Sequence, residues 1–267
     1  MNNSDIEIQT KHYQSRIKVI DNNLCFTERS HYYSKKITHV ETFGPNWILV
    51  FGIVPPERVF IQCPDGLYHL SGPVALFIPS FFVIKWHINP GVLNFNIISS
   101  STILKLDQEN KAKIFKWNPN VLPKNWSDVK SILYHSNESD QIPNGSQKSL
   151  LAERAKNYID NHYTENLKIE TVASQLKTNR VYLSREFKKN FYISPVEYRH
   201  QLRIYEALKL INQGVGLTQS IYASGFESLN QFSAYFKKYF HTYPSHYQYP
   251  KSKRSKLKPT DLEPSFY

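Results

Sequence analysis

The spacing of hydrophobic and polar positions changes near the middle of the chain. From about Ile17 to Leu106, apolar runs of three to eight residues, rich in β-branched and aromatic side chains, alternate with prolines and glycines. Such runs are typical of short antiparallel strands, and residues 47–54, which precede two prolines, are one example. We therefore expect residues 1–135 to form a β-rich domain that closes into a small barrel or a sandwich.

Beyond residue 150 the apolar positions follow a helical period, and they do so up to about residue 249. The preceding stretch, 136–149, is polar, contains turn-forming residues and has no aromatic ring, as expected of an interdomain linker. The pattern predicts an α+β chain in which the β-rich domain is followed by an all-α domain over 150–249. We expect few apolar contacts to cross the linker.

An internal repeat lies within the helical region. Residues of the first copy recur 49 positions later in the second; the pairs are Asn179 and Ser228, Leu183 and Phe232, Phe187 and Phe236, Phe191 and Phe240, and Pro195 and Pro244. Each copy has a polar residue able to cap a helix, an apolar stripe, a Phe-Lys-Lys step and a terminating proline. The repeat predicts two similar helical units, joined by one long helix from Pro195 to Ile211.

The outward faces of the two repeated helices carry the candidate binding residues. These are Arg180, Val181, Ser184, Arg185 and Lys188 in the first, and Leu229, Asn230, Gln231, Ser233, Lys237 and Lys238 in the second. Arginine can pair with guanine, Asn and Gln can pair with adenine, and lysine suits phosphate, so each helix could lie in a DNA major groove about 12 Å wide. The connecting helix could hold the two about 34 Å apart, one turn of B-DNA. Either helix alone could also be an ordinary solvated basic helix.

These motifs closely resemble the DNA-binding domain of the AraC/XylS transcription regulators. The matching segments are Leu183–Lys189, Ile193–Tyr198, Arg203–Ala207, Gly225–Ser228 and Phe232–Lys238. The resemblance implies a seven-helix, two-lobed domain with two helix-turn-helix motifs, whose third and sixth helices, the reading helices, enter successive major grooves. It also implies double-stranded promoter DNA and RNA polymerase as partners, and it favours an activator.

The chain departs from this family at several positions. Where the family usually has glycine after each reading helix, this chain has Tyr192 and His241, so we expect a left-handed residue with a side chain there or a different closure. Further departures, which make the second unit look the weaker reader, are at Ser220, Ile221, Ala234 and Gln248.

The N-terminal half resembles, more loosely, the cupin-type barrel of some members of the family. The similarity rests on Leu76–Pro79, Trp86 and Pro90–Gly91. A barrel of this size can enclose a small effector, and the candidate lining residues, which would otherwise be plain core, are Trp47, Phe51, Tyr68, Phe77 and Trp86. A short amphipathic helix near residues 126–133 would serve a homodimer or cover the barrel.

Composition narrows the class of protein. The net charge of +11 favours a polyanionic partner, nucleic acid ahead of a membrane, and the segment 250–267 is expected to be a basic tail. The histidines of the barrel are scattered, so no metal site is predicted. With two cysteines, no leader-like start and no apolar run near 18 residues, we expect a cytoplasmic protein without a membrane span.

No nucleophile, metal cluster or carboxylate pair is arranged for catalysis, so neither an enzyme nor a cofactor is predicted. The sequence instead predicts a sequence-specific DNA-binding transcriptional regulator with a β-rich effector or dimerisation domain in front. The alternative is a constitutive or architectural DNA-binding protein without a ligand sensor.

Overall fold

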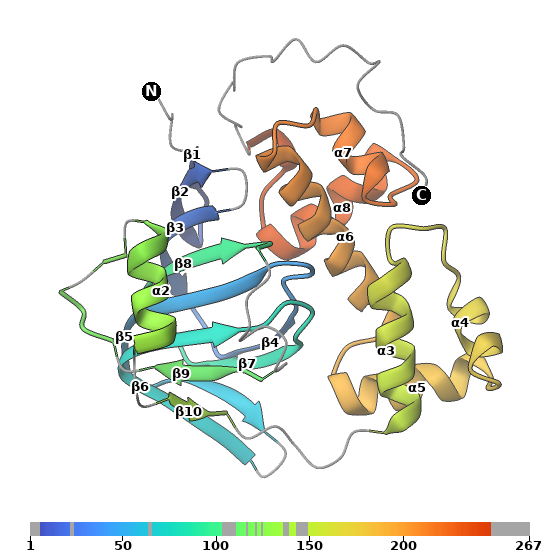
Figure 1. The fold of residues 1–267 in the computed structure, drawn as a ribbon, viewed down its shortest axis with the longest axis horizontal. Helices are drawn as coiled ribbons and strands as arrows, with labels where there is room; N and C mark the ends of the chain where they lie inside the picture. The colour runs from blue at the N-terminus through green and yellow to red at the C-terminus, as the bar shows by residue number, and fades with distance from the viewer. Residues whose placement is uncertain are drawn as a thin grey trace.

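A sheet-rich N-terminal region lies against a helical C-terminal region in the computed structural model (Figure 1). The residues that the structure describes are 6–21, 24–63, 66–102, 111–115, 117–120, 122–123, 125–135, 139–142 and 149–246. The predicted tail, 250–267, and most of the predicted linker, 136–149, lie outside them. We refer to the two described regions as the sheet domain, up to residue 142, and the helical domain, from residue 149.

The strands of the sheet domain form one antiparallel sheet. Their bounds are β1 Ile6–Gln9, β2 Tyr13–Asp21, β3 Leu24–Tyr33, β4 Ile37–Glu41, β5 Trp47–Cys63, β6 Gly66–Ile78, β7 Ile84–Ile88, β8 Gly91–Ser100, β9 Lys113–Phe115 and β10 Ser139–Gln141. β10 lies inside the segment expected to be linker, where it pairs with β9. The antiparallel sheet agrees with the alternating apolar runs of the sequence.

The sheet is open, which corrects the expectation of a closed barrel. Among the described residues the strand order runs β1-β2-β3-β8-β5-β6-β9-β10 and does not return to β1, while β4 and β7 branch from β5. The branch arises because the register of β5 against β6 shifts between Val54 and Val59. The first part of β5 pairs with β8 and the part after the shift pairs with β7. A shift of this kind bends a strand, so the sheet curves.

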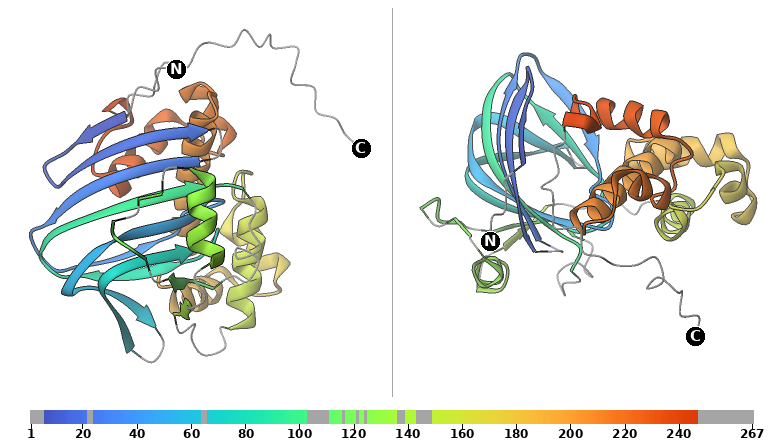
Figure 2. Two further views of the ribbon diagram at one scale, coloured as in Figure 1. Left: turned by 60° about the vertical axis from the view of Figure 1, so that its left-hand side comes forward. Right: turned by 90° about the horizontal axis from the view of Figure 1, so that it is seen from above.

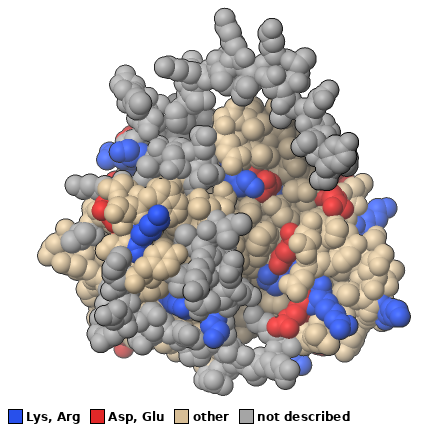
Figure 3. Space-filling view, viewed as in Figure 1, with Lys and Arg blue, Asp and Glu red and all other residues tan. Residues whose placement is uncertain are grey.

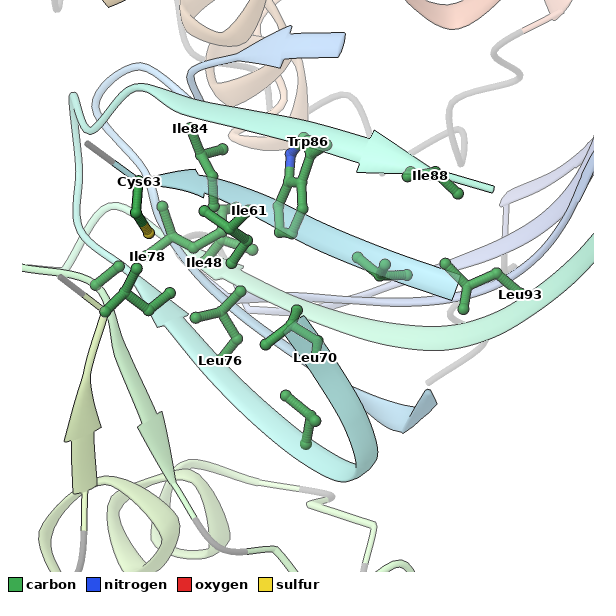
Figure 4. Close-up of a cluster of buried hydrophobic side chains, with 14 of the residues drawn as sticks. Ile48, Ile61, Cys63, Leu70, Leu76, Ile78, Ile84, Trp86, Ile88 and Leu93 are labelled. Atoms are coloured by element: carbon green, nitrogen blue, oxygen red, sulfur yellow. The ribbon is translucent and has the colours of Figure 1, made fainter. Parts of the chain in front are cut away.

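Each face of the curved sheet has its own buried cluster. On one face Ile48, Leu76 and Trp86 belong to a large apolar cluster, and Figure 4 shows Trp86 of β7 pointing toward β5. On the other face, Val129 and Leu133 of α2 (Trp126–His135) pack against the sheet. The sheet therefore lies between α2 and the helical domain, as the right-hand view of Figure 2 shows. From the sequence, this helix was expected either to serve a homodimer or to cover the barrel. In the structure it covers the sheet.

The helical domain consists of two lobes joined by one long helix. Its elements are α3 Leu150–His162, α4 Ile169–Gln175, α5 Arg180–Phe191, α6 Pro195–Asn212, α7 Leu217–Ala223, α8 Leu229–Phe240 and the 3-10 turn η1 Pro244–His246. α3 to α5 share one buried cluster with the start of α6, and α7 and α8 share another with the rest of α6. The first lobe is α3–α5 and the second is α7–α8.

Apolar contacts cross between the domains, contrary to the expectation that few would do so. Ile8, Tyr13 and Ile17 of the first two strands belong to the buried cluster of the second lobe. Phe81 and Val83 pack against that of the first lobe. The sequence pattern hid these contacts because the same side chains also satisfy the alternation expected within a sheet.

Candidate nucleic-acid interface

The two repeated helices begin with the same capping geometry. The side-chain oxygen of Asn179 accepts a hydrogen bond from the backbone N–H of Tyr182 at 2.8 Å. The Ser228 hydroxyl accepts one from the N–H of Gln231 at 3.2 Å. Each bond satisfies a backbone donor that the first turn of a helix cannot pair internally. The predicted caps are confirmed, and they fix where α5 and α8 begin.

Both helices also end in the same way. Tyr192, with φ of 63°, and His241, with φ of 53°, adopt the left-handed conformation. Their N–H groups donate to the carbonyls of Lys188 and Lys237 respectively. The first of the two expected closures, a left-handed residue that carries a side chain, is therefore confirmed at both positions.

The outward face of α5 presents most of the residues predicted for it. Leu183, Phe187 and Phe191 are buried, while Val181 is 77% exposed. Arg180, Arg185 and Lys188 are also exposed, and Ser184 is half-buried. The helix therefore offers a continuous polar and basic surface, with one methyl-bearing side chain near its start.

The two arginines of α5 differ in their surroundings. Arg180 forms an ion pair of 2.6 Å with Glu170 of α4. The Arg185 guanidinium lies over the ring of Tyr182, 5.2 Å from its centroid, and forms no ion pair with any described side chain. A stacked guanidinium keeps its in-plane N–H groups available, so Arg185 is better placed than Arg180 to bind a base edge.

The outward face of α8 is less available for binding DNA than that of α5. Leu229 is 42% exposed and Asn230 is exposed, whereas Gln231 and Ser233 are half-buried. The Gln231 side-chain oxygen accepts a hydrogen bond of 3.2 Å from the backbone N–H of Glu227. Gln231 thus helps to hold the start of its own helix, which reduces its freedom to pair with a base.

The lysines at the end of α8 both have intramolecular partners. Lys237 donates to the Tyr243 hydroxyl at 2.8 Å and lies over the same ring. Lys238 forms an ion pair with Glu197 of α6. Phosphate would have to compete with these partners. Acidic and basic side chains are also interspersed on another part of the surface. Figure 3 shows acidic side chains between basic ones over the side of the molecule that carries α3 to α5.

The predicted ligand-lining residues are divided between the two faces of the sheet. Trp47, Phe51 and Phe77 belong to the cluster beneath α2, whereas Tyr68 packs against the opposite cluster and Trp86 belongs to it. Successive residues of a strand point to opposite faces, and the apolar runs gave no indication of which face would be hollow.

A cavity of about 280 Å³ lies between the sheet and the helical domain. Of the five predicted residues only Trp86 lines it. The sequence interpretation missed its polar lining, which comes from both domains and includes Arg29, His31, Glu41, Gln201, Lys209 and His241. Nothing in the sequence indicated that the helical domain would cover this face.

The polar groups of the cavity are electrostatically perturbed. Burial, together with the positive charge of Arg29 and three neighbouring histidines, lowers the pKa of His31 to about 4. Burial raises the pKa of Tyr33 to about 12, and the carboxylate of Glu41 adds to the shift. At neutral pH this wall therefore combines a neutral imidazole, a neutral phenol and a guanidinium.

No group of three or more His, Cys, Asp or Glu side chains among the described residues is arranged to hold a metal ion. None of the helices in this part of the chain is both long and apolar enough to cross a membrane.

Comparison with known proteins agrees with the arrangement of α4 to η1. Residues 172–249 match the model of a family described as "Helix-turn-helix domain". The chain is 30% identical over 138 residues to the uncharacterized HTH-type transcriptional regulator YijO of Escherichia coli (strain K12), covering 51% of this chain and 49% of that protein. It is 31% identical over 98 residues to the lactose operon transcription activator of Staphylococcus xylosus, covering 36% and 35%. The chain thus spans half or less of these relatives.

Solved structures are similar as well. ToxT from Vibrio cholerae is 15% identical, with a TM-score of 0.48, over 89% of this chain and 98% of that one. The C-terminal domain of AraT, a response regulator from Geobacillus stearothermophilus, is 27% identical, with a TM-score of 0.37, over 43% and 96%. From its motifs, the family match and the named relatives, this chain carries a helix-turn-helix DNA-binding domain of the AraC/XylS type.

Proposed function

We propose that this protein is a sequence-specific transcriptional regulator that reads two adjacent major grooves of promoter DNA with α5 and α8. The observation that carries the proposal is the repetition of one structural unit. α5 and α8 share a capped start, an outward polar face and a left-handed end, at a constant separation of 49 residues. Two equivalent helices joined by one rigid helix suit two grooves of one duplex.

The two reading helices contribute unequally in this proposal. α5 supplies the base contacts, led by Arg185, with Ser184 and Val181 beside it. α8 supplies Asn230 as its main base-reading side chain, because Gln231 takes part in the helix cap. Lys188, Lys237 and Lys238 bind phosphate, which positions the protein without reading sequence.

Regulation of transcription requires partners beyond DNA. The name of one relative, a lactose operon transcription activator, favours activation, and RNA polymerase is then the natural partner. We place the protein in the cytoplasm, where promoter DNA and polymerase are found in bacteria, and we retain a homodimer as its proposed assembly. Catalysis and a cofactor form no part of the proposal.

A footprint tests the DNA-binding proposal. The operator would first be selected from random duplexes by the purified full-length chain, and the complex would then be probed by base methylation. We expect protection in two major grooves one helical turn apart, stronger in the groove that meets α5. Protection confined to a single groove would remove α8 from the set of readers, and uniform protection would favour the architectural alternative.

We also propose that a small effector controls the protein from the sheet domain, whose open, curved sheet we interpret as a variant of a cupin-like barrel. The cavity beside Trp86 is the proposed site, and its mixed apolar and polar lining suits an effector that is apolar or aromatic in part. We expect binding without a metal. Elemental analysis of protein purified without chelator would contradict this if it returned a stoichiometric transition metal.

A further inference from the structure

The residues that end the two reading helices both contact the sheet domain. They occupy equivalent positions of the repeat, 49 residues apart, and both are left-handed residues with large side chains. Glycine adopts this conformation without strain, so a Tyr and a His here are costly for the helix end alone. A contact made by each side chain would account for their presence.

The first contact joins Tyr192 to β7. The ammonium group of Lys85 lies over the Tyr192 ring, 4.6 Å from its centroid. Near it, Phe81 makes an edge contact with Tyr163, and its carbonyl accepts a long hydrogen bond from the Tyr198 hydroxyl. β7 therefore contacts the end of α5 through Lys85, and the segment that leads into β7 contacts the residue after α3 and the start of α6.

The second contact joins His241 to the turn between β1 and β2. The rings of His12 and His241 meet edge to face, with centroids 6.2 Å apart. The sequence neighbours of the two histidines are also in contact: the hydroxyl of Tyr13, which follows His12, donates to the carbonyl of Phe240, which precedes His241, at 2.5 Å. That carbonyl belongs to the last turn of α8, where no helical N–H is left to pair with it.

Between these two points the sheet domain also holds α6. The Gln201 side chain accepts from the N–H of Thr42 at 2.9 Å and donates to the carbonyl of Val40 at 3.0 Å. These bonds copy the pairing that a neighbouring strand would make with β4. The sheet domain thus contacts α5, α6 and α8 together.

We propose that Tyr192 and His241 are paired docking points through which the sheet domain sets the relative placement of the two reading helices. The inference rests on the proposed reading roles of α5 and α8. Since β1–β2 and β7 belong to one sheet that also walls the cavity, a change in the sheet's curvature would move one docking point relative to the other. The geometry of DNA reading would change without any contact between the effector and DNA.

Glycine substitutions separate docking from helix capping. Tyr192→Gly and His241→Gly keep, and ease, the left-handed conformation, so the helix ends should form while the docking contacts are lost. Lys177→Gly is the matched control, because Lys177 is also left-handed, with φ of 53°, and is exposed at the end of α4. From the sheet side, Lys85→Met removes the contact with Tyr192, and Tyr13→Phe removes the hydrogen bond to the Phe240 carbonyl beside the His241 contact. Both substitutions leave the sequences of the two reading helices unaltered.

The measurement is the distance between α5 and α8 in the full chain without DNA. Spin labels would be introduced as noncanonical residues at Lys189 and Ala234, both exposed and neither a docking point. We expect a narrow distance distribution in the parent and the Lys177→Gly chain, and a broader or displaced one in the Tyr192→Gly/His241→Gly chain and the Lys85→Met/Tyr13→Phe chain. An unchanged distribution in the last two would overturn the docking role, as would equal broadening by Lys177→Gly.

This design keeps the two proposals distinguishable. Distances respond to docking whether or not the helices read DNA. If the distances change as expected but the footprint shows no groove protection, the reading role fails and the docking role stands. If the footprint is as expected and the distances are unchanged, only the docking role fails.

Discussion

Arg185 and Lys238 show how two basic side chains on equivalent helices can do different work. Arg185 stacks on Tyr182 and lies mid-helix on α5, while Lys238 lies near the end of α8 and is paired with Glu197. A guanidinium can bridge guanine O6 and N7, whereas an ammonium meets phosphate as a point charge. We therefore expect Arg185 to contribute to sequence specificity and Lys238 to contribute to overall affinity for DNA.

We predict that Arg185→Ala weakens binding to the operator far more than binding to a scrambled duplex, by roughly 1–3 kcal/mol of lost discrimination. Titration of both duplexes at several salt concentrations measures it. Arg180→Ala is the matched control, since Arg180 is already paired with Glu170 and should change discrimination less. Equal losses on the two duplexes would remove Arg185 from the readers.

For Lys238→Ala we expect an equal loss on both duplexes and a salt slope lower by about one, as for one lost phosphate contact. Glu197→Gln should have the opposite effect, because it releases the Lys238 ammonium from its intramolecular partner. The same titrations give both results. If Glu197→Gln leaves binding unchanged while Lys238→Ala weakens it, the ion pair does not compete with DNA.

At the scale of helices and strands, the sequence specified the helical domain well. The caps at Asn179 and Ser228 and the proline at Pro195 are local signals, so the starts of α5 and α8 were predicted correctly and the end of α6 was predicted to within one residue. The sheet depended on non-local facts. Neither the register shift in β5 nor the face covered by α2 has a local signal, so the barrel was expected to close and Trp47 was assigned to a cavity that it does not line.

The stability of the folded chain should depend on pH through His31 of β3, which lines the cavity between the domains. His31 has a pKa of about 4, lowered first by burial and then by Arg29, His241, His12 and His39, from an ordinary 6.5. Because the folded state disfavours the proton, the free energy of unfolding is undiminished above about pH 6.5. It falls as the pH drops from 6.5 toward 4, where the unfolded state binds a proton that the folded state does not.

Unfolding midpoints measured between pH 7.5 and 4.5 check this expectation. In His31→Gln, the fall over that range should be smaller than in the parent chain. His200 is a matched control from the interior of the second lobe, since burial lowers its pKa to about 3 as well. His200→Gln should reduce the pH dependence without affecting the contact between the domains, and an unaltered pH profile for His31→Gln would rule out the role of that residue.

For the molecule as a whole, the main finding is that the two domains share their cores. The cluster of the second lobe includes Ile8, Tyr13 and Ile17, and the helix α6 contacts the sheet through Gln201 and Tyr205. Two domains joined only by a linker would leave the DNA-binding unit independent. Here a ligand in the cavity would contact both domains at once, which couples its binding to the position of the helices.

The degree of coupling can be tested with the fragment 146–267. The repeat and the caps lie entirely within it, as do most side chains of the clusters around Phe187 and Phe232, so we expect it to fold as a helical unit. It lacks the sheet side chains that complete both clusters, and burying one Ile or Phe side chain is worth roughly 1.5–3 kcal/mol. We therefore predict a helical circular dichroism spectrum together with a urea midpoint clearly below that of the helical domain in the full chain. Equal midpoints would show that the shared cores add no stability, and an unfolded fragment would show that the helical domain cannot fold without the sheet.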